Sequence, residues 1–526
     1  MTADFDLAIV GSGFGGSLLS MVAQRLGLSV MLLERGRHPR FAVGESTSPL
    51  TNLLLEQIAR RYDLPRLLPL TTFGAWQRAY PEIGCGLKRG FTYYKHTAVE
   101  EFETRPDRAN ELLVAASPND EVSDTHWLRS DVDNFLLKEA ITLGVVYSDE
   151  TETLLDSVSS AGAALTTVRK GITQHITCRL LIDASGPRGF LHRALDLQEI
   201  DFDGFPATQA LFSHFTGVHR TDAMPQFASD AVQPYAPDDA ALHHVFDDGW
   251  MWVLRFGNGV TSAGYSAFGP TVVDLHNPDR TGTWRRFLAR YPTIEAQFAD
   301  AQPIREFTYA PRLAYRSANA SGDAWAMLPS AAAFIDPLFS TGIPLTLIGI
   351  ERLGRILEDA WGMPELPSRL REYADLTLSD ADWTATFVGG CFAAMPNFPT
   401  FVDYSMYYFA AASFSEMARR IDRRDLASRF LLQNRLDFAA GLREGARLLH
   451  SHRGSPATGE CAAFAANVAA AVQSSNIAGL CDPAKRNWYD IDWADVIENA
   501  GRLEMRPADM RALLAAADWA SYTPVK

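Results

Sequence analysis

Cysteine is scarce in this sequence, and its spacing shows no pattern of metal or disulfide chemistry. The 526 residues include 5 cysteines, at positions 85, 178, 391, 461 and 481, and no two of them form a CxxC pair. An odd, scattered set of this kind indicates neither a disulfide framework nor a zinc site. We therefore expect no bound metal and a reducing, cytoplasmic location.

Basic residues and long hydrophobic runs are also lacking. Lys and Arg number 48 against 63 Asp and Glu, a formal net charge of −15 at pH 7, so broad binding to nucleic acid or anionic membranes is not expected. The most apolar stretch, Ala324 to Ile350, is broken by one aspartate and three prolines, which argues against a membrane span. The first residues include Asp4 and Asp6 and no basic residue, unlike the start of a signal peptide, so we expect no secretory signal.

A glycine-rich turn near the N-terminus is the most informative motif present. Gly11-x-Gly13-x-x-Gly16 follows the short apolar run Leu7-Ala-Ile-Val10, opens a helix-compatible stretch, and precedes a second strand that ends at Glu34. In a dinucleotide site the three glycines allow a tight turn, close approach of a pyrophosphate and close helix packing, while the acidic residue accepts hydrogen bonds from ribose. A turn that only packs a helix would leave Glu34 unexplained. The residues predicted to bind the cofactor here are Gly11, Gly13, Phe14, Gly15, Gly16, Glu34 and Arg35.

Three further segments resemble the superfamily of FAD-dependent monooxygenases and halogenases. Gly322-Asp323 resembles its second FAD motif, which implies that Asp323 binds the ribityl chain. Leu181 to Pro187 resembles the strand and turn near the adenine, and Arg129 resembles an arginine that starts a helix beside the cofactor. Taken alone, Arg129 and Asp133 could equally form a solvated i, i+4 ion pair. Together with the glycine motif, these segments imply FAD as the cofactor.

Three shorter motifs resemble the flavin-dependent halogenases in particular. Gly44-Glu-Ser-Thr47 resembles their loop beside the isoalloxazine ring, and Gly86-Leu-Lys88-Arg-Gly90 resembles the segment that carries their essential lysine. Phe334-x-x-Pro337-x-x-Ser340-x-Gly342 resembles the motif between the flavin and substrate sites. The resemblance implies cofactor contacts from Glu45, Ser46, Pro337, Gly342 and Ile343, and a halide site at Thr341 and Gly342.

The resemblance also implies a reaction. A separate flavin reductase supplies reduced FAD. The reduced FAD, oxygen, and chloride or bromide together give hypohalous acid. Lys88 then relays the halogen to an electron-rich carbon of the substrate. Lys88 could act as an ammonium that donates a hydrogen bond to the acid or, if neutral, as a nucleophile. A structural role is the alternative, because a Lys-Arg pair is often a solvated face.

The substrate end departs from the tryptophan halogenases. Their glutamate before the serine of the third motif is Phe339 here, which implies a substrate other than free tryptophan, such as a phenol, pyrrole or polyketide, possibly bound to a carrier protein. Trp250-x-Trp252 matches part of another halogenase element, although such spacing commonly marks one face of a strand. The predicted substrate residues are Phe339, Ser340, Trp250 and Trp252.

The predicted fold class is α/β: an FAD-binding, Rossmann-like body of the monooxygenase type, with an antiparallel substrate-side sheet and a helical C-terminal region. We expect the body at 1–365, with cofactor segments near 1–50, 120–190 and 320–365, the interleaved sheet near 70–119 and 191–319, and mostly helix at 366–526. Two other functions stay open. One is an FAD-dependent monooxygenase without halogenation, and the other is a flavoprotein whose aromatic segment, Phe387 to Phe414, docks a partner.

Overall fold

A mainly parallel sheet lies at one end of the molecule and carries the glycine-rich turn. The computed structural model describes residues 3–229, 231–269, 273–451 and 460–516. Strand β1 (Phe5–Val10) lies between β2 (Val30–Leu33) and β10 (Ile172–Asp183), and all three are parallel. Strands β19 (Trp325–Met327) and β7 (Val146–Ser148) extend the sheet on either side, also in parallel. The strand–turn–helix–strand unit predicted from the glycine motif is therefore confirmed.

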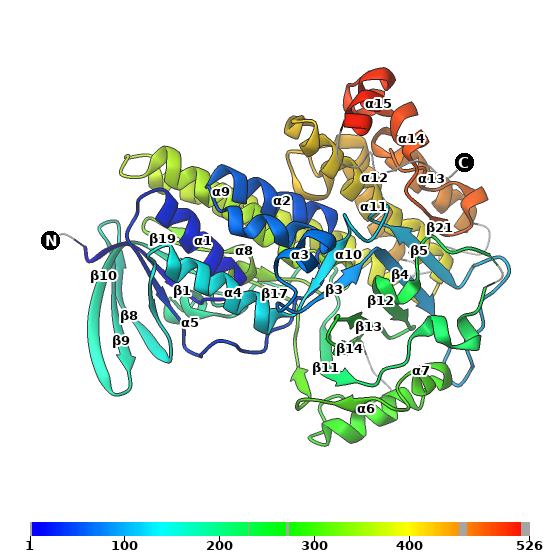
Figure 1. Cartoon of the computed structure of the whole chain (residues 1–526), viewed down its shortest axis with the longest axis horizontal. Coiled ribbons are helices and arrows are strands. Elements are labelled where there is room, and N and C mark those ends of the chain that lie inside the picture. The colour runs from blue at the N-terminus through cyan, green and yellow to red at the C-terminus, as the bar shows by residue number, and fades with distance from the viewer. Residues whose placement is uncertain (1–2, 230, 270–272, 452–459, 517–526) are drawn as a thin grey trace.

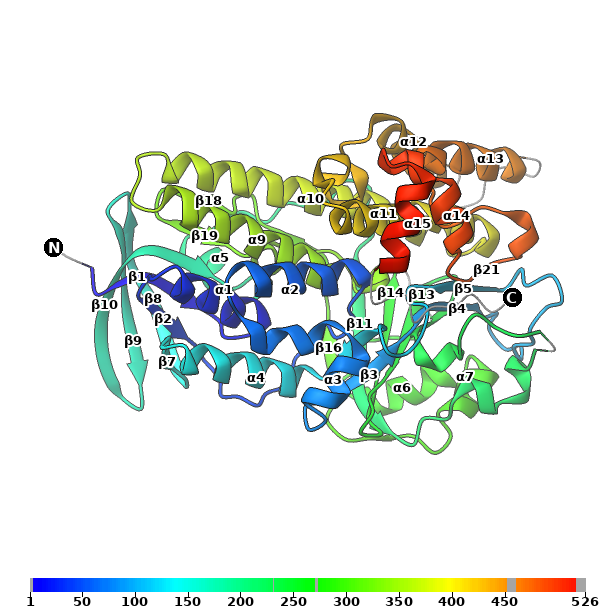
Figure 2. The same ribbon diagram turned by 45° about the horizontal axis from the view of Figure 1, so that its top comes forward.

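Short antiparallel strands complete this sheet. The hairpin of β8 (Thr151–Ser159) and β9 (Gly162–Arg169) continues into β10 and forms the far end of the molecule (Figure 2). The two-residue strand β18 (Ser321–Gly322) runs antiparallel to β19.

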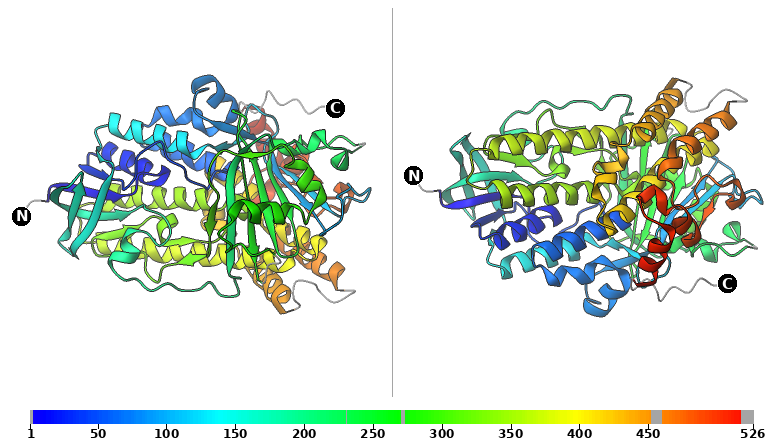
Figure 3. Two further views of the ribbon diagram at one scale, coloured as in Figure 1. Left: turned by 90° about the horizontal axis from the view of Figure 1, so that it is seen from below. Right: turned by 90° about the horizontal axis from the view of Figure 1, so that it is seen from above.

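Helices cover the parallel sheet along the length of the molecule. Helix α1 (Phe14–Arg25) packs against α4 (Arg129–Thr142) on one side and against α9 (Gly342–Ala360) on the other. Helix α2 (Pro49–Arg61) and the 29-residue α10 (Leu366–Ala394) each pack against α9, so that these helices run side by side (Figure 3). Apolar side chains of α1 and α9 are buried between them, which fixes the start of each helix beside the sheet.

A second, larger sheet lies at the other end of the molecule (Figure 1). Its main strands follow the order β15 (Gln302–Pro303), β11 (Thr208–Thr216), β14 (Thr261–Phe268), β13 (Gly249–Arg255), β12 (Ala241–Val245), β4 (Gly90–Lys95), β5 (Glu111–Ala115) and β21 (Trp488–Tyr489), with β16 (Thr308–Ala310) also on β11. Most neighbours are antiparallel as predicted, but β12–β4 and β5–β21 are parallel. Both exceptions join segments that are distant in sequence, where no tight hairpin constrains the strand direction.

The second sheet is covered on both faces. Helices α6 (Arg280–Leu288) and α7 (Pro292–Gln297) cover one face. On the other face lie α10 and α11 (Phe398–Arg420), whose aromatic side chains from Phe387 to Phe414 are mostly buried in the core. The tail continues with α12 (Leu436–Ser451), α13 (Cys461–Val472), α14 (Trp493–Glu498) and α15 (Pro507–Ala516).

Small elements connect these layers. Strands β3 (Cys85–Lys88) and β6 (Asp124–Trp127) form a two-stranded antiparallel ribbon. The remaining α-helices and strands are α3 (Phe73–Ala79), α5 (Phe190–Ala194), α8 (Pro329–Ala332), β17 (Tyr315–Arg316) and β20 (Ala333–Phe334), and short 3-10 helices join several of the elements. The cysteines Cys85, Cys178 and Cys391 are buried, Cys461 and Cys481 are partly buried, and all five are free thiols. Among the described residues, no helix is both long and apolar enough to cross a membrane.

Candidate functional site

A cavity of about 490 Å³ lies where the carboxyl ends of the parallel strands face the second sheet. Gly13, Ala184 and Pro329, which follow β1, β10 and β19, line one side of it, and side chains of β11, β12 and β13 line another. In open α/β sheets, ligands bind outside the carboxyl ends of the parallel strands. The cavity therefore has the position expected for a cofactor.

Each glycine of the glycine-rich turn is needed for a different structural reason. Gly11 has a φ of +104°, and a Cβ added there would lie 2.5 Å from the carbonyl oxygen of Ala184. A Cβ on Gly16 would lie 1.9 Å from the carbonyl oxygen of Gly11, so both positions are set by the fold. At Gly13, which lines the cavity, an added Cβ would meet nothing closer than 3.6 Å. The fold leaves this position open, so its glycine fits the approach of a ligand such as the FAD pyrophosphate.

Glu34 is buried at the end of β2 and already has protein partners. Its carboxylate accepts hydrogen bonds from the Ser12 amide at 3.1 Å, the Gly36 amide at 2.8 Å and the Arg40 guanidinium at 3.3 Å. Burial raises its pKa, but Arg40 and the two amides outweigh burial and hold the pKa below its usual value. Arg40 lines the cavity, whereas Glu34 and the exposed Arg35 do not, so ribose binding by these two residues stays a prediction.

Arg129 forms a buried ion pair rather than a solvated one. Its Nε and Nη2 donate to the two carboxylate oxygens of Asp133 at 2.8 and 2.9 Å, with side-chain exposures of 8% and 0%. Nη1 donates to the carbonyl oxygens of Val43 and Gly44 at 2.8 and 3.0 Å. The guanidinium also lies over the ring of Phe14, 4.8 Å from its centroid. Arg129 thus fixes the loop that carries the predicted Glu45 and Ser46, and all three line the cavity.

Replacing Arg129 with methionine should therefore destabilise the protein and weaken cofactor binding together. The single change leaves a buried, unpaired carboxylate at Asp133, which costs about 3–5 kcal/mol. The matched control is the double variant Arg129→Met, Asp133→Leu, which removes both charges. We expect urea unfolding to show much of the lost stability restored in the double variant. FAD titration should stay weak in both, because the contacts to the carbonyls of Val43 and Gly44 are missing in each.

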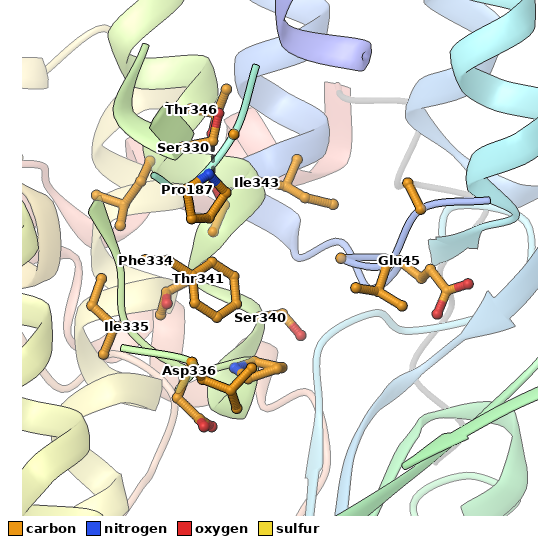
Figure 4. A pocket seen from close by; sticks show the side chains of 18 of the residues that line it. Glu45, Pro187, Ser330, Phe334, Ile335, Asp336, Ser340, Thr341, Ile343 and Thr346 are labelled. Carbon is orange, nitrogen blue, oxygen red and sulfur yellow. Dashed lines mark hydrogen bonds between the residues drawn. The ribbon is translucent and has the colours of Figure 1, made fainter. Parts of the chain in front are cut away.

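Asp323 does not belong to this site, and its predicted contact with the ribityl chain is wrong. It lies in the turn before β19, at the opposite end of that strand from the cavity, and its half-exposed carboxylate pairs with Arg371 at 3.2 Å. Because β19 is parallel to β1 and β10, only residues after it reach the cavity edge. Ser330, which the sequence analysis missed, takes that position and lines the cavity (Figure 4). Its sequence signal was the short apolar run that ends at Met327.

The third motif forms one wall of the cavity. Pro337, Ser340, Thr341, Gly342 and Ile343 all line it, and Glu45 stands across the cavity from Ser340 and Thr341 (Figure 4). Gly342 begins the 19-residue helix α9, whose first amides form the kind of positive terminus that favours an anion. The position suits the predicted halide site, which stays a prediction.

Phe339 and Ser340 lie on opposite sides of this wall. Both have left-handed backbone conformations, with φ values of 65° and 56°. Such conformations are uncommon for residues other than glycine and mark a locally strained turn. Ser340 faces the cavity, whereas Phe339 is fully buried on the far side and does not line it.

The far side is filled by what we call the aromatic cluster. Phe339 has ring contacts with Tyr93, Phe387, Phe401, Tyr408 and Phe409 at centroid distances of 4.9 to 6.3 Å. The residues of the aromatic cluster come from β4, the third motif, α10 and α11. They are Phe91, Tyr93, Phe339, Phe387, Phe401, Tyr404, Tyr408 and Phe409.

Trp250 and Trp252 lie on one face of β13, as their spacing predicted, and both line the cavity. The Trp250 indole donates to Asp336 at 3.1 Å, and the Trp252 indole donates to Ser262 at 3.2 Å. Asp336 also accepts from the Ser266 hydroxyl at 2.9 Å, and burial raises its pKa to about 7. These bonds fix both indoles against the cavity wall.

Lys88 is fully buried, which excludes the solvated-face interpretation. Its Nζ donates to the carbonyl oxygen of Thr47 and lies 3.8 Å from the centroid of the Phe91 ring. Arg89, by contrast, turns outward to Asp120 at 2.7 Å. Burial lowers the pKa of Lys88 to about 7, although Asp124 opposes this effect.

Lys88 and the cavity lie on either side of the Glu45–Ser46 loop. Lys88 itself does not line the cavity, but Thr47, which accepts its hydrogen bond, directly follows the two loop residues that do. Phe91 beneath the ammonium belongs to the aromatic cluster and contacts Tyr408 at 5.6 Å. The structure thus brings the predicted lysine, the aromatic cluster and the cavity wall together.

Comparisons with known proteins agree with this geometry. A family model described as tryptophan halogenase matches residues 109–397. The chain is 31% identical over 401 residues to the monodechloroaminopyrrolnitrin halogenase PrnC of Pseudomonas fluorescens, covering 75% of this chain and 69% of that protein. It is 30% identical to the tetracycline 7-halogenase of Kitasatospora aureofaciens, covering 75% and 71%. A crystal structure of the halogenase PltM with phloroglucinol and FAD has the same fold, with a TM-score of 0.80, 23% identity, and coverage of 93% and 99%.

Proposed function

Since the chain belongs to the flavin-dependent halogenases, we propose that Lys88 activates hypohalous acid for attack by an electron-rich aromatic substrate that binds beside the aromatic cluster. The protein is an FAD-dependent oxidoreductase with halide as co-substrate. When bound in its reduced form, FAD would supply two electrons that, with two from chloride or bromide, convert oxygen to hypohalous acid and water. The observation that carries the proposal for Lys88 is its burial between the cavity loop and the ring of Phe91.

The residues around the cavity fit FAD. The open position at Gly13, with Arg40 and Arg129 beside it, suits a pyrophosphate, because two guanidinium groups and the start of α1 face the same point. Ser46, Pro337 and the start of α9 would hold the ring system farther along the cavity. Thr341 and Gly342 would offer backbone amides to the halide.

Lys88 can act as a fixed hydrogen-bond donor. Its ammonium is oriented by the Thr47 carbonyl and the Phe91 ring, which leaves further N–H groups for the oxygen of hypohalous acid. A charge-assisted bond to that oxygen polarises the oxygen–halogen bond. As the ring carbon attacks the halogen, the ammonium passes a proton to the oxygen, which leaves as water, and the proton then lost from the ring restores the ammonium. The surrounding aromatic side chains exclude water, which strengthens this interaction.

Phe339 and the aromatic cluster favour a largely apolar aromatic substrate. The buried, apolar Phe339 stands where tryptophan halogenases have a glutamate, so a free amino acid substrate would find no charged partner at this position. Named relatives include halogenases of aminopyrrolnitrin and tetracycline compounds and a brominase of pyrrole on a peptidyl-carrier protein. We propose a phenol, pyrrole, indole or polyketide ring, free or on a carrier protein, and a separate flavin reductase as the partner. The free cysteines suit a reducing, cytoplasmic location.

The test is a bromination assay. The protein would be mixed with FAD, a flavin reductase, NADH, oxygen and a panel of phenols, pyrroles and indoles, with and without bromide. Mass spectrometry should show products with the bromine isotope doublet only when bromide is present. Oxygenated products without the doublet would instead identify a monooxygenase.

The pH dependence of halogenation should report the buried lysine. The ammonium form predominates below its pKa, which burial lowers from 10.5 to about 7. The rate should therefore be highest below about pH 7 and fall about tenfold per pH unit above it. The measurement is the rate of aromatic bromination with excess reduced FAD, beside NADH oxidation as a control for the reductase. A rate that stays constant up to pH 9 would contradict an ammonium with this pKa.

A further inference from the structure

Lys88 has a carboxylate directly opposite it on the neighbouring strand. In the β3–β6 ribbon, Lys88 pairs with Asp124 in antiparallel register, so both side chains leave the same face of the ribbon. Asp124 is 3% exposed and Lys88 is 0% exposed. An amine and a carboxyl group, both buried, therefore face each other across the ribbon beside the proposed halogen relay.

The position of Asp124 is fixed by its neighbours, although its carboxylate is only half satisfied. Oδ1 accepts a hydrogen bond from the Asn52 amide at 2.8 Å, while Oδ2 has no hydrogen-bond partner. The Asp124 amide donates to Ser117 at 3.3 Å, and the Ser123 hydroxyl donates to the Lys88 carbonyl at 2.7 Å, which locks the register of the ribbon. A buried carboxylate oxygen without a partner is costly, so its retention calls for an explanation.

The other groups around the pair do not provide Lys88 with a counter-charge. His126 and His243 face Lys88 from β6 and β12, and burial lowers the pKa of each to about 3, so both are neutral. Tyr408 of α11 has a pKa raised by burial and is also neutral. Burial raises the pKa of Asp124, and the charge of Lys88 opposes this effect, so each group of the pair favours the charged form of the other. Glu416 and Arg420 of α11 also act on Asp124 and pair with each other at 2.8 Å.

We propose that Asp124 is the positioning residue for Lys88, supplying the buried negative charge that keeps the lysine side chain an ammonium inside the aromatic surroundings. An isolated ammonium in such a site would lose its proton to avoid desolvation. The carboxylate does not hold Nζ directly, because Nζ donates to Thr47 and stays free to donate to the oxidant as well. The proposal rests on the proposed function of Lys88.

The pKa of Lys88 can be measured without activity or cofactor. The sequence has only six lysines, at 88, 95, 138, 170, 485 and 526, so lysine labelled with ¹³C at Cε gives a simple NMR spectrum. The Lys88 signal is the one that disappears in Lys88→Met. In Asp124→Asn we expect its titration to shift down by about one pH unit or more. Asp124→Glu should restore most of the shift, because it keeps the charge.

A matched control is available in the second sheet. Glu111 is also a fully buried carboxylate with one hydrogen bond, from the Trp488 indole at 2.9 Å, and one oxygen without a partner. Glu111→Gln should leave the Lys88 titration unchanged. If Asp124→Asn does not fold, Asp124→Ser replaces it, because the smaller side chain can still accept from Asn52.

Activity adds a second measurement. In Asp124→Asn the alkaline fall of the bromination rate should move to lower pH by the same amount as the NMR titration. A loss of rate that is equal at every pH would indicate a structural role and overturn the proposal, as would an unchanged Lys88 pKa in folded Asp124→Asn. Failure of the proposed function is distinguishable, because Lys88→Met would then still brominate whatever the NMR titration shows.

Discussion

Replacing Lys88 with methionine is expected to lower the halogenation rate by about 100- to 10,000-fold, the range in which positioned acid–base groups contribute. Methionine keeps the length and the apolar stem of the side chain, so it can still pack on Phe91, but it cannot donate a hydrogen bond to the oxidant. FAD binding and oxygen consumption should persist, because Lys88 does not line the cavity. Hypohalous acid should then escape, and a thiol or phenol trap in solution would detect it.

The control for this variant is Lys95→Met. Lys95 is the next lysine along the chain, and it donates to the Met395 carbonyl at 2.8 Å, outside the aromatic cluster. The Lys95→Met protein should brominate the panel at a rate within a few-fold of the parent protein. If Lys88→Met brominated the panel at the parent rate, Lys88 would have a structural role and the halogen would travel by another route.

Gly13→Val is expected to weaken FAD binding by about 100-fold or more, equivalent to roughly 2.7 kcal/mol. The backbone at Gly13 has φ −65° and ψ −179°, a conformation that valine also adopts, and its Cβ would meet only ordinary contacts. The added methyl groups would instead occupy the space that the pyrophosphate needs. Equilibrium titration of the apoprotein with FAD, followed by flavin fluorescence, measures this loss.

Gly16→Val separates loss of binding from loss of folding. Its Cβ would lie 1.9 Å from the Gly11 carbonyl oxygen, so the turn could not form and the thermal unfolding temperature should drop. Gly13→Val should unfold near the temperature of the parent apoprotein. A Gly13→Val protein that bound FAD normally would place the cofactor elsewhere.

Local patterns were sufficient to predict the cofactor end of the molecule. The glycine turn is defined by a strand, a helix start and an acidic residue within about 30 positions, and every one of these interactions is short in sequence. The burial of the Arg129–Asp133 pair could not be predicted in this way, since an i, i+4 spacing is the same on a solvated and on a buried helix face.

Strand direction explains the error at Asp323. A Gly-Asp pair and a short apolar run stand side by side in the sequence, but only pairing with β10 decides which end of β19 faces the cavity. Lys88 and Arg89 illustrate the same limit. Successive side chains of a strand point to opposite faces, but the sequence does not show which of these two residues points into the core. The aromatic cluster joins β4 to α10 and α11, and no local pattern could show that its members meet.

The pairing of β21 with β5 has a consequence for the synthesis of this enzyme. The hydrogen bond between the Trp488 indole and Glu111 joins residues 377 positions apart, so it cannot form until Trp488 has left the ribosome. Until then β5 is an open edge, which is a site for association with other unfinished chains. Folding should therefore be slow and concentration-dependent, and production of the protein should benefit from chaperones and low temperature.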